Sequence, residues 1–125
     1  MELGLHHGLT EQIVSSAIEV HRHLGPGLLE SVYDKALCRE FTLRQIPFAR
    51  QVRIPLFYKG DLIAEHRADL IVWDSVVVEV KSVERFDPVH LAQLLTYLRA
   101  TKLRVGLLLN FNSALLKNGI RRVAL

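Results

Sequence analysis

The sequence contains a single cysteine, Cys38, so no intrachain disulfide can form. This scarcity is typical of a reducing compartment, and we expect a cytoplasmic protein in which Cys38 is a small core residue of a helix. No apolar run approaches the ~20 residues of a membrane span, and the amino end lacks a charged segment followed by an apolar one. We therefore expect neither membrane insertion nor secretion.

Several functional motifs are also missing. The sequence has no G-x-x-x-x-G-K-[ST] loop, no G-x-G-x-x-G loop and no G-x-S-x-G turn, so nucleotide binding and serine hydrolysis have no support. His21 and His23 would point to different faces of a helix, and no cysteine or carboxylate set completes a zinc site around them.

The charge balance is only mildly basic. Sixteen Lys and Arg residues against thirteen Asp and Glu give a formal net charge of +3 and an isoelectric point near 9.3. This excess permits DNA or RNA as a partner without requiring either. With 50% apolar residues, the 125-residue chain is long enough to bury a core, so we expect a single domain over residues 1–125.

Hydrophobic periodicity predicts alternating helices and strands. Helices are expected at residues 10–24, 28–44 and 87–101, with Thr10 and Asp87 as N-caps. Strands are expected at residues 48–58, 62–73, 76–83, 105–111 and 120–124. A strand, a helix and a strand in succession favour a parallel crossover, so the expected architecture is an α/β sandwich around a mixed sheet.

Two charged residues interrupt the apolar stretch V-V-V-E-V-K-S at 76–82. Glu79 and Lys81 share one face of this strand, and Asp69 on the preceding strand lies beside them only if odd residues pair with odd residues. That register requires an odd-length turn or a bulge in place of a two-residue turn at 74 and 75. We predict this irregularity.

These three residues have two interpretations. Asp69, Glu79, the Val80 carbonyl and waters would suit Mg²⁺, with Lys81 beside a phosphate or an attacking water. The alternative is a salt bridge from Lys81 to Glu79 or Asp69, which is common in sheets. The three residues alone leave both interpretations open.

Two helices add candidate residues. Glu30 lies on the flank of the apolar stripe of the second helix, where we expect it to be half-buried, although an acid in a first turn is also favoured by the helix dipole. On the third helix, we expect Gln93, Tyr97 and His90 opposite a leucine stripe, facing a substrate or water. The stripe consists of Leu91, Leu94, Leu95 and Leu98.

Four ordered motifs carry a family resemblance that spans nearly the whole chain. Asp69 followed by E-V-K at 79–81 resembles the PD-(D/E)xK nuclease superfamily, although Ala68 stands where many members have proline. Q-L-L-T-Y at 93–97 is similar to the Q-h-x-x-Y motif of the branch related to lambda exonuclease and the RecB nuclease domain. G-L-L-E-S-V-Y at 27–33 looks like the signature of the small bacterial GxxExxY family.

The resemblance implies a restriction-endonuclease-like core, αβββαβ, and a role for each residue. Asp69 and Glu79 would bind the metal, Lys81 would support the nucleophilic water or the developing charge, and Glu30 would add a helix carboxylate to the metal. Gln93 and Tyr97 would position the substrate or the lysine.

The leading hypothesis is a Mg²⁺- or Mn²⁺-dependent nuclease that acts on DNA more readily than on RNA. A rival hypothesis is a non-catalytic module that binds nucleic acid or protein and retains the nuclease fold. We also consider a homodimer and a protein partner that delivers the substrate.

Overall fold

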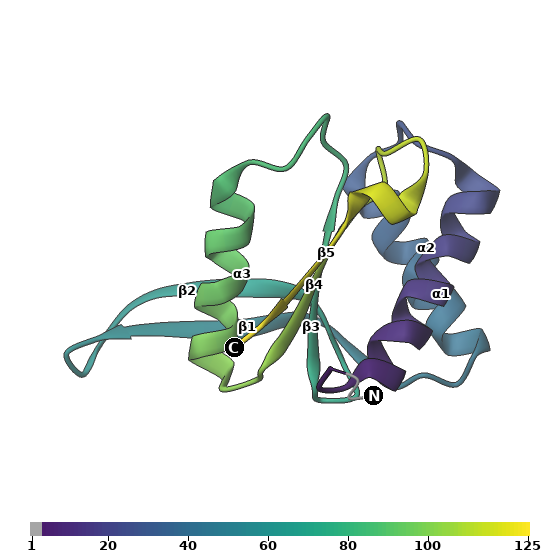
Figure 1. Cartoon of the computed structure of the whole chain (residues 1–125). Helices are drawn as coiled ribbons and strands as arrows, with labels where there is room; N and C mark the ends of the chain where they lie inside the picture. Colours follow the sequence, from purple (N-terminus) through teal and green to yellow (C-terminus); the bar gives the residue numbers. More distant parts are fainter. Residues whose placement is uncertain (1–3) are drawn as a thin grey trace.

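A five-stranded mixed sheet with helices on both faces forms the centre of the molecule (Figure 1). The structure is a computed structural model that describes residues 4–125. Its helices are α1 (His7–Leu24), α2 (Glu30–Leu43), α3 (Pro88–Thr101) and the short 3₁₀ helix η1 (Leu116–Gly119). Its strands are β1 (Phe48–Tyr58), β2 (Asp61–Val72), β3 (Val76–Lys81), β4 (Val105–Asn110) and β5 (Ile120–Ala124).

The strands lie side by side in chain order, and within residues 4–125 only β3 and β4 run parallel. The parallel pair is joined by α3, as expected for a crossover that needs a helix to return the chain. From α2 to β4 the order is αβββαβ, which confirms the predicted α/β class with its restriction-endonuclease-like core. Among the described residues, no helix combines the length and the apolar character needed to cross a bilayer.

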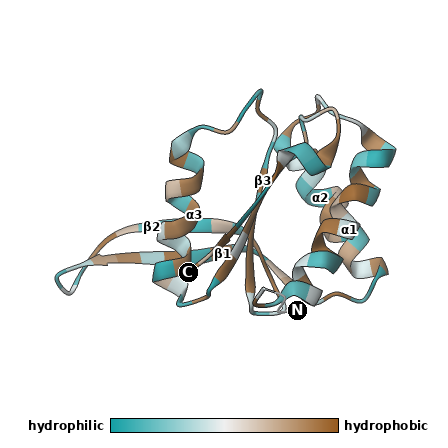
Figure 2. Cartoon of the chain, in the orientation of Figure 1, coloured by the Kyte–Doolittle hydropathy of each residue, from teal (hydrophilic) through white to brown (hydrophobic). Residues whose placement is uncertain are grey.

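Each face of the sheet has its own apolar core. α1 and α2 pack on one face, where Leu70, Val78 and Val80 point, and α3 packs on the other, where Ile71 and Val77 point. Figure 2 shows the result as brown, apolar residues along the central strands and as teal residues on the outer sides of the helices. Successive side chains of a strand point to opposite faces of the sheet. Because helices cover both faces, the central strands bury their side chains on both sides.

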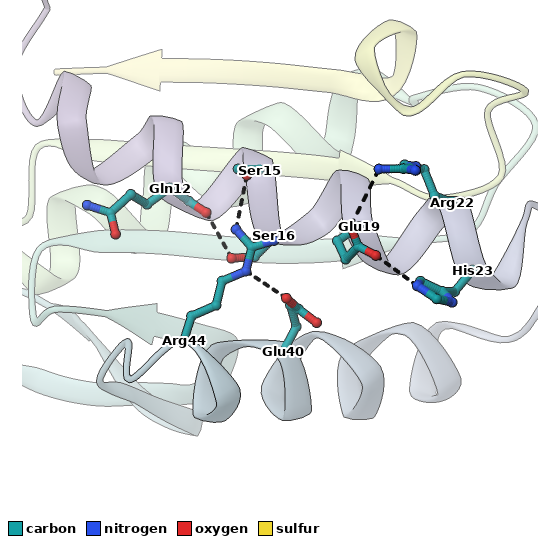
Figure 3. Close-up of polar contacts among 8 residues, drawn as sticks. All are labelled: Gln12, Ser15, Ser16, Glu19, Arg22, His23, Glu40 and Arg44. Carbon is teal, nitrogen blue, oxygen red and sulfur yellow. Dashed lines mark hydrogen bonds and ion pairs between the residues drawn. The ribbon is translucent and has the colours of Figure 1, made fainter.

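Polar contacts join α1 and α2 on their outer side (Figure 3). Arg44, just after α2, donates through Nε to Glu40 at 2.6 Å and through Nη1 to Ser15 of α1 at 3.0 Å. On α1 itself, Glu19 pairs with Arg22 and His23. These exposed pairs each contribute at most about 1 kcal/mol, so they orient the helices more than they stabilise them.

The two histidines near the end of α1 diverge, as predicted. His23 pairs with Glu19 at the surface, whereas the buried His21 lies with Nε2 2.8 Å from the Ser113 carbonyl oxygen.

Two helix starts test the predicted caps. α1 begins at His7, so the prediction that Thr10 is its N-cap was wrong: Thr10 lies inside the helix, buried, and its hydroxyl donates to the His7 carbonyl. Asp87 is confirmed as the N-cap of α3, because its carboxylate accepts from the Val89 N–H at 2.9 Å. His90 accepts in return from the Asp87 N–H, which completes a capping box.

The predicted faces of α3 were wrong in part, although Leu94 and Leu98 are buried as expected. Tyr97 is buried with Leu94 and Leu98 against the sheet, while Leu91, expected in the core, is 41% exposed. A tyrosine can occupy such a position because its ring packs while its hydroxyl finds a polar partner, here His66.

The connection between β2 and β3 has the predicted odd length. Val72 pairs with Val76, so three residues, 73–75, form the turn, and Trp73 and Asp74 adopt left-handed φ angles of 53° and 51°. Because the turn is odd, odd residues of β2 face odd residues of β3. The register therefore directs Asp69 towards Glu79.

Candidate active site

β2 and β3 separate at Asp69 and Glu79, and the two carboxylates occupy the gap. The last regular pair is Leu70 with Val78. Beyond it, the Asp69 N–H donates to Glu79 Oε2 at 2.7 Å, and the Val80 N–H donates to Asp69 Oδ2 at 2.8 Å. Side chains thus replace the next hydrogen bonds of the ladder and hold the two acids together.

The neighbouring strand is irregular at the same level. Gln51 of β1 faces Asp69 with φ at 49° and interrupts the run of paired residues. Leu70 packs under α1 and α2, whereas Ala68, two residues earlier, packs under α3. The strand therefore changes faces at Asp69, which places this carboxylate at the break and away from either apolar core.

Burial dominates the electrostatics of the pair. Glu79 is only 4% exposed, and burial, followed by the charge of Asp69, raises the pKa of its carboxyl to about 8. Burial also raises the pKa of Asp69, although the hydrogen bond from the Val80 N–H lowers it in part. The pair therefore favours a bound proton, or a cation, over two uncompensated negative charges.

Lys81 is the last residue of β3 and is half-buried. Its carbonyl accepts from the Phe111 N–H at 2.9 Å, which fixes the backbone beside β4. Its ammonium forms no ion pair with any described residue, so the salt bridge to Glu79 or Asp69 is not observed. The lysine charge still lowers the pKa of both acids from a distance.

A cavity of about 220 Å³ opens beside this break, between α2 and the sheet. Its lining residues are Glu30, Ser31, Asp34, Arg50, Gln51, Asp69 and Val80. Glu30 lies on this wall, but the prediction that it is half-buried was wrong: it is exposed, because it is the first residue of α2. Its carboxylate accepts from the Ser82 N–H at 3.4 Å, just after β3.

Sequence reasoning missed Asp34. This residue lies one turn after Glu30 on α2, is 6% exposed, and accepts from Arg50 Nε at 3.1 Å. The i, i+4 spacing from Glu30 is the signal that would have placed both acids on one helix face.

Cys38 lies beside Asp34 on α2. Burial raises the pKa of this half-buried thiol to about 11, which keeps the thiol protonated and unreactive.

α3 contributes Tyr97 and Gln93 from the opposite face. Tyr97 is 3% exposed, and its hydroxyl lies 3.2 Å from His66 Nδ1. Burial, then the charges of Glu79 and Asp69, raises the pKa of Tyr97 to about 12, while hydrogen bonding with Gln93 lowers it. His66 is a second missed residue, since nothing in its local sequence shows which side chain it meets.

The donor set is suited to a small hard cation. No three His, Cys, Asp or Glu side chains form a metal cage within residues 4–125. Mg²⁺ does not need one, because it commonly binds one or two carboxylates and completes its shell with waters and substrate phosphates. Asp69 and Val80 line the cavity and Glu79 lies beside Asp69, so this set offers the two carboxylates that Mg²⁺ requires.

Two carboxylates and a lysine where strands separate, on an αβββαβ core, define the restriction-endonuclease-like class of protein. The chain belongs to the PD-(D/E)XK nuclease superfamily, whose family model matches residues 7–123. Comparisons with curated proteins and with solved structures gave no significant match. Membership of the GxxExxY branch stays a prediction.

Proposed function

We propose that the protein is a Mg²⁺- or Mn²⁺-dependent nuclease that hydrolyses phosphodiester bonds, in DNA more readily than in RNA, in the cytoplasm. The observation that carries the proposal is the pairing of Asp69 and Glu79 in the gap between β2 and β3. Glu79 is buried and Asp69 is half-buried, and two such acids with raised pKa values are costly to ionise unless a cation joins them. Membership of a nuclease superfamily supports the same chemistry.

Each residue has a role in this proposal. Asp69 and Glu79, with the Val80 carbonyl, would hold the metal ion, which when bound supplies a Lewis acid and lowers the pKa of water. Lys81 orients the attacking water or stabilises charge on the phosphate, since its ammonium has no acidic partner among the described residues.

Outer residues would support this set. Glu30 lies on the cavity wall and would add a helix carboxylate to the metal site. Tyr97 and Gln93 support Glu79 from α3 and position the substrate, because the negative charge of Glu79 already influences the Tyr97 hydroxyl. Asp34 joins this outer set through the cavity that it shares with Asp69.

A nuclease assay with linear, nicked and branched DNA and with RNA tests the proposal. We expect Mg²⁺- or Mn²⁺-dependent cleavage that falls by at least ~100-fold in Lys81→Ala and in Asp69→Asn, because each removes a group that acts on the reacting atoms. Lys117→Ala, an exposed lysine of η1, is the matched control and keeps full activity. Cleavage that survives both site substitutions belongs to a contaminant and refutes the proposal.

Calorimetry addresses the metal separately. Binding of Mn²⁺ must displace the proton that Glu79 holds below pH 8, so metal binding releases protons and strengthens as the pH rises towards 8. The measured heat then depends on the ionisation enthalpy of the buffer. Binding that is unchanged in Asp69→Asn would contradict the ligand assignment.

One observation favours the rival function, a non-catalytic nucleic-acid- or protein-binding module. Both carboxylates already accept backbone N–H groups, so the strand break is satisfied structurally without a metal. If the protein binds nucleic acid without divalent ions and cleaves none in their presence, this second function is correct.

A further inference from the structure

The β1–β2 hairpin extends beyond the rest of the sheet, past α3 and away from α1 and α2 (Figure 1). Its inner side packs against α3 through Val52, Ile54 and Leu56. Because side chains alternate along a strand, Arg53 points to the other side. That outward side carries no helix in Figure 1.

Two arginines face each other across this outward side. Arg53 and Arg67 are direct partners in the register of β1 and β2. Like charges directly opposite one another destabilise a strand pair, so the arrangement needs a compensating anion. Glu65 supplies one for Arg53, which donates to it at 2.5 Å, while Arg67 forms no ion pair with the described residues.

The same charges are readily accessible. Side-chain exposure is 64% for Arg53 and 44% for Glu65. The hydrogen bond from Arg53 is the main cause of the lowered pKa of Glu65, and the charge of Arg67 contributes less. The Glu65 carboxylate therefore pairs with Arg53 alone, and the trio, with Arg67 unpaired, carries a net charge of +1.

The arginine pair lies next to the active site. Arg67 precedes Asp69 by two residues on β2, about 7 Å along the strand. The cavity beside Asp69 opens on the α2 side of the sheet, which is the side that Arg53 and Arg67 face, and Arg50 lines it. Cationic groups therefore continue from the cavity along the hairpin.

We propose that the hairpin face, formed by Arg53, Glu65 and Arg67, binds the phosphate backbone of the nucleic acid that the active site cleaves. This inference rests on the proposed nuclease function. Guanidinium groups bind phosphates in a bidentate manner, and a phosphate would supply the missing anion between the two arginines.

The chemistry of the hairpin favours a nucleic acid over a second copy of this chain. A symmetric contact between two hairpin faces would bring arginines against arginines. At the tip, Phe57 and Tyr58 are 65% and 63% exposed, and aromatic rings beside cations are the combination that holds nucleic-acid bases and backbone together.

Binding measured without divalent ions separates this surface from catalysis. We would titrate labelled DNA duplex, its single strands and RNA in EDTA by fluorescence anisotropy, over a range of salt concentrations. Arg53→Ala/Arg67→Ala should bind about tenfold or more weakly, with the slope of log affinity against log salt reduced by about 1.5 to 2. Glu65→Gln should bind several-fold more tightly.

The matched control is Arg22→Ala/Lys117→Ala, which removes the same charge far from the hairpin. Arg22 is an exposed arginine paired with Glu19, as Arg53 is with Glu65 (Figure 3). This control should bind within about twofold of the parent protein. Thermal unfolding of every variant excludes loss of fold as the cause.

The outcomes distinguish the two proposals. Equal weakening in both double variants, unchanged binding in Arg53→Ala/Arg67→Ala, no binding by the parent protein, or a dimer that these substitutions dissociate would each overturn the hairpin assignment. Arginine-dependent binding without cleavage in Mg²⁺ would support the hairpin and reject the nuclease. Cleavage that requires Lys81 but is unchanged in Arg53→Ala/Arg67→Ala would support the nuclease and reject the hairpin assignment.

Discussion

At the scale of single residues, the site is governed by the cost of burying negative charge. Glu79 is held between Asp69 and the α3 side of the sheet, where water cannot screen its carboxylate. The Lys81 ammonium offsets part of this cost without contacting the acid. Protonation of Glu79 is therefore coupled to folding as well as to metal binding.

Glu79→Gln should alter the pH dependence of stability. The pKa of Glu79 is near 4.5 in an unfolded chain and about 8 in the fold, so the folded protein binds this proton more tightly. Its stabilising contribution is complete below about pH 4.5 and is lost as the pH rises through 8. We expect metal-free Glu79→Gln to lose less stability over this interval, by up to a few kcal/mol.

Urea unfolding at several pH values between 5 and 9 measures this effect. The relevant quantity is the difference between the two proteins at each pH, because groups far from Glu79 titrate alike in both and cancel. Parallel curves would show that Glu79 titrates near its ordinary pKa.

At the scale of elements, the candidate active site depends on where each helix and strand ends. Asp87 caps α3, and α3 in turn carries Gln93 and Tyr97 to the site. The three-residue turn at 73–75 sets the register that brings Asp69 to Glu79. Local signals of this kind can be read from sequence because a cap or a turn involves only neighbouring residues.

Asp87→Ala should destabilise the protein by about 1 kcal/mol, because the Val89 N–H loses its acceptor at the start of α3. Asp87→Asn keeps a side-chain oxygen and should cost only a few tenths of a kcal/mol. Denaturant unfolding compares the three proteins. Equal losses in both variants would mean that the charge of Asp87, and not its cap, stabilises the helix.

The candidate site was only partly predictable from the sequence, because contacts between separate elements leave no local signal. Asp69, Glu79 and Lys81 follow from strand alternation and an odd turn, and the structure brings the two acids together as expected. His66 and Asp34 were missed because their partners come from other elements. The buried face of α3 was misplaced because it depends on how the helix rotates against the sheet, which helical period alone does not determine.

At the scale of the whole molecule, a glycine in the sheet determines how closely α3 can pack on it. Gly106 of β4 lies directly under α3, and a Cβ atom there would come within 2.7 Å of Leu94 Cδ1. The missing side chain lets α3 approach the sheet closely. This approach also brings Tyr97 within reach of His66 on β2.

A double-mutant cycle tests this close contact. Gly106→Ala should destabilise the protein by about 1–3 kcal/mol through overpacking, and Leu94→Ala by about 2–5 kcal/mol through a cavity. The double variant should lose clearly less than the sum, because the new methyl group enters the space that the leucine leaves. Additive losses would show that the two positions do not share this space.

The reciprocal hydrogen bonds at the strand break affect how an intact motif should be read in related sequences. Asp69 and Glu79 each satisfy a backbone N–H, so the demands of folding alone would preserve both acids in a descendant that no longer cuts anything. The Lys81 side chain satisfies no backbone group within residues 4–125. Its replacement, with both acids retained, would therefore be the earliest mark of a lineage that has abandoned catalysis.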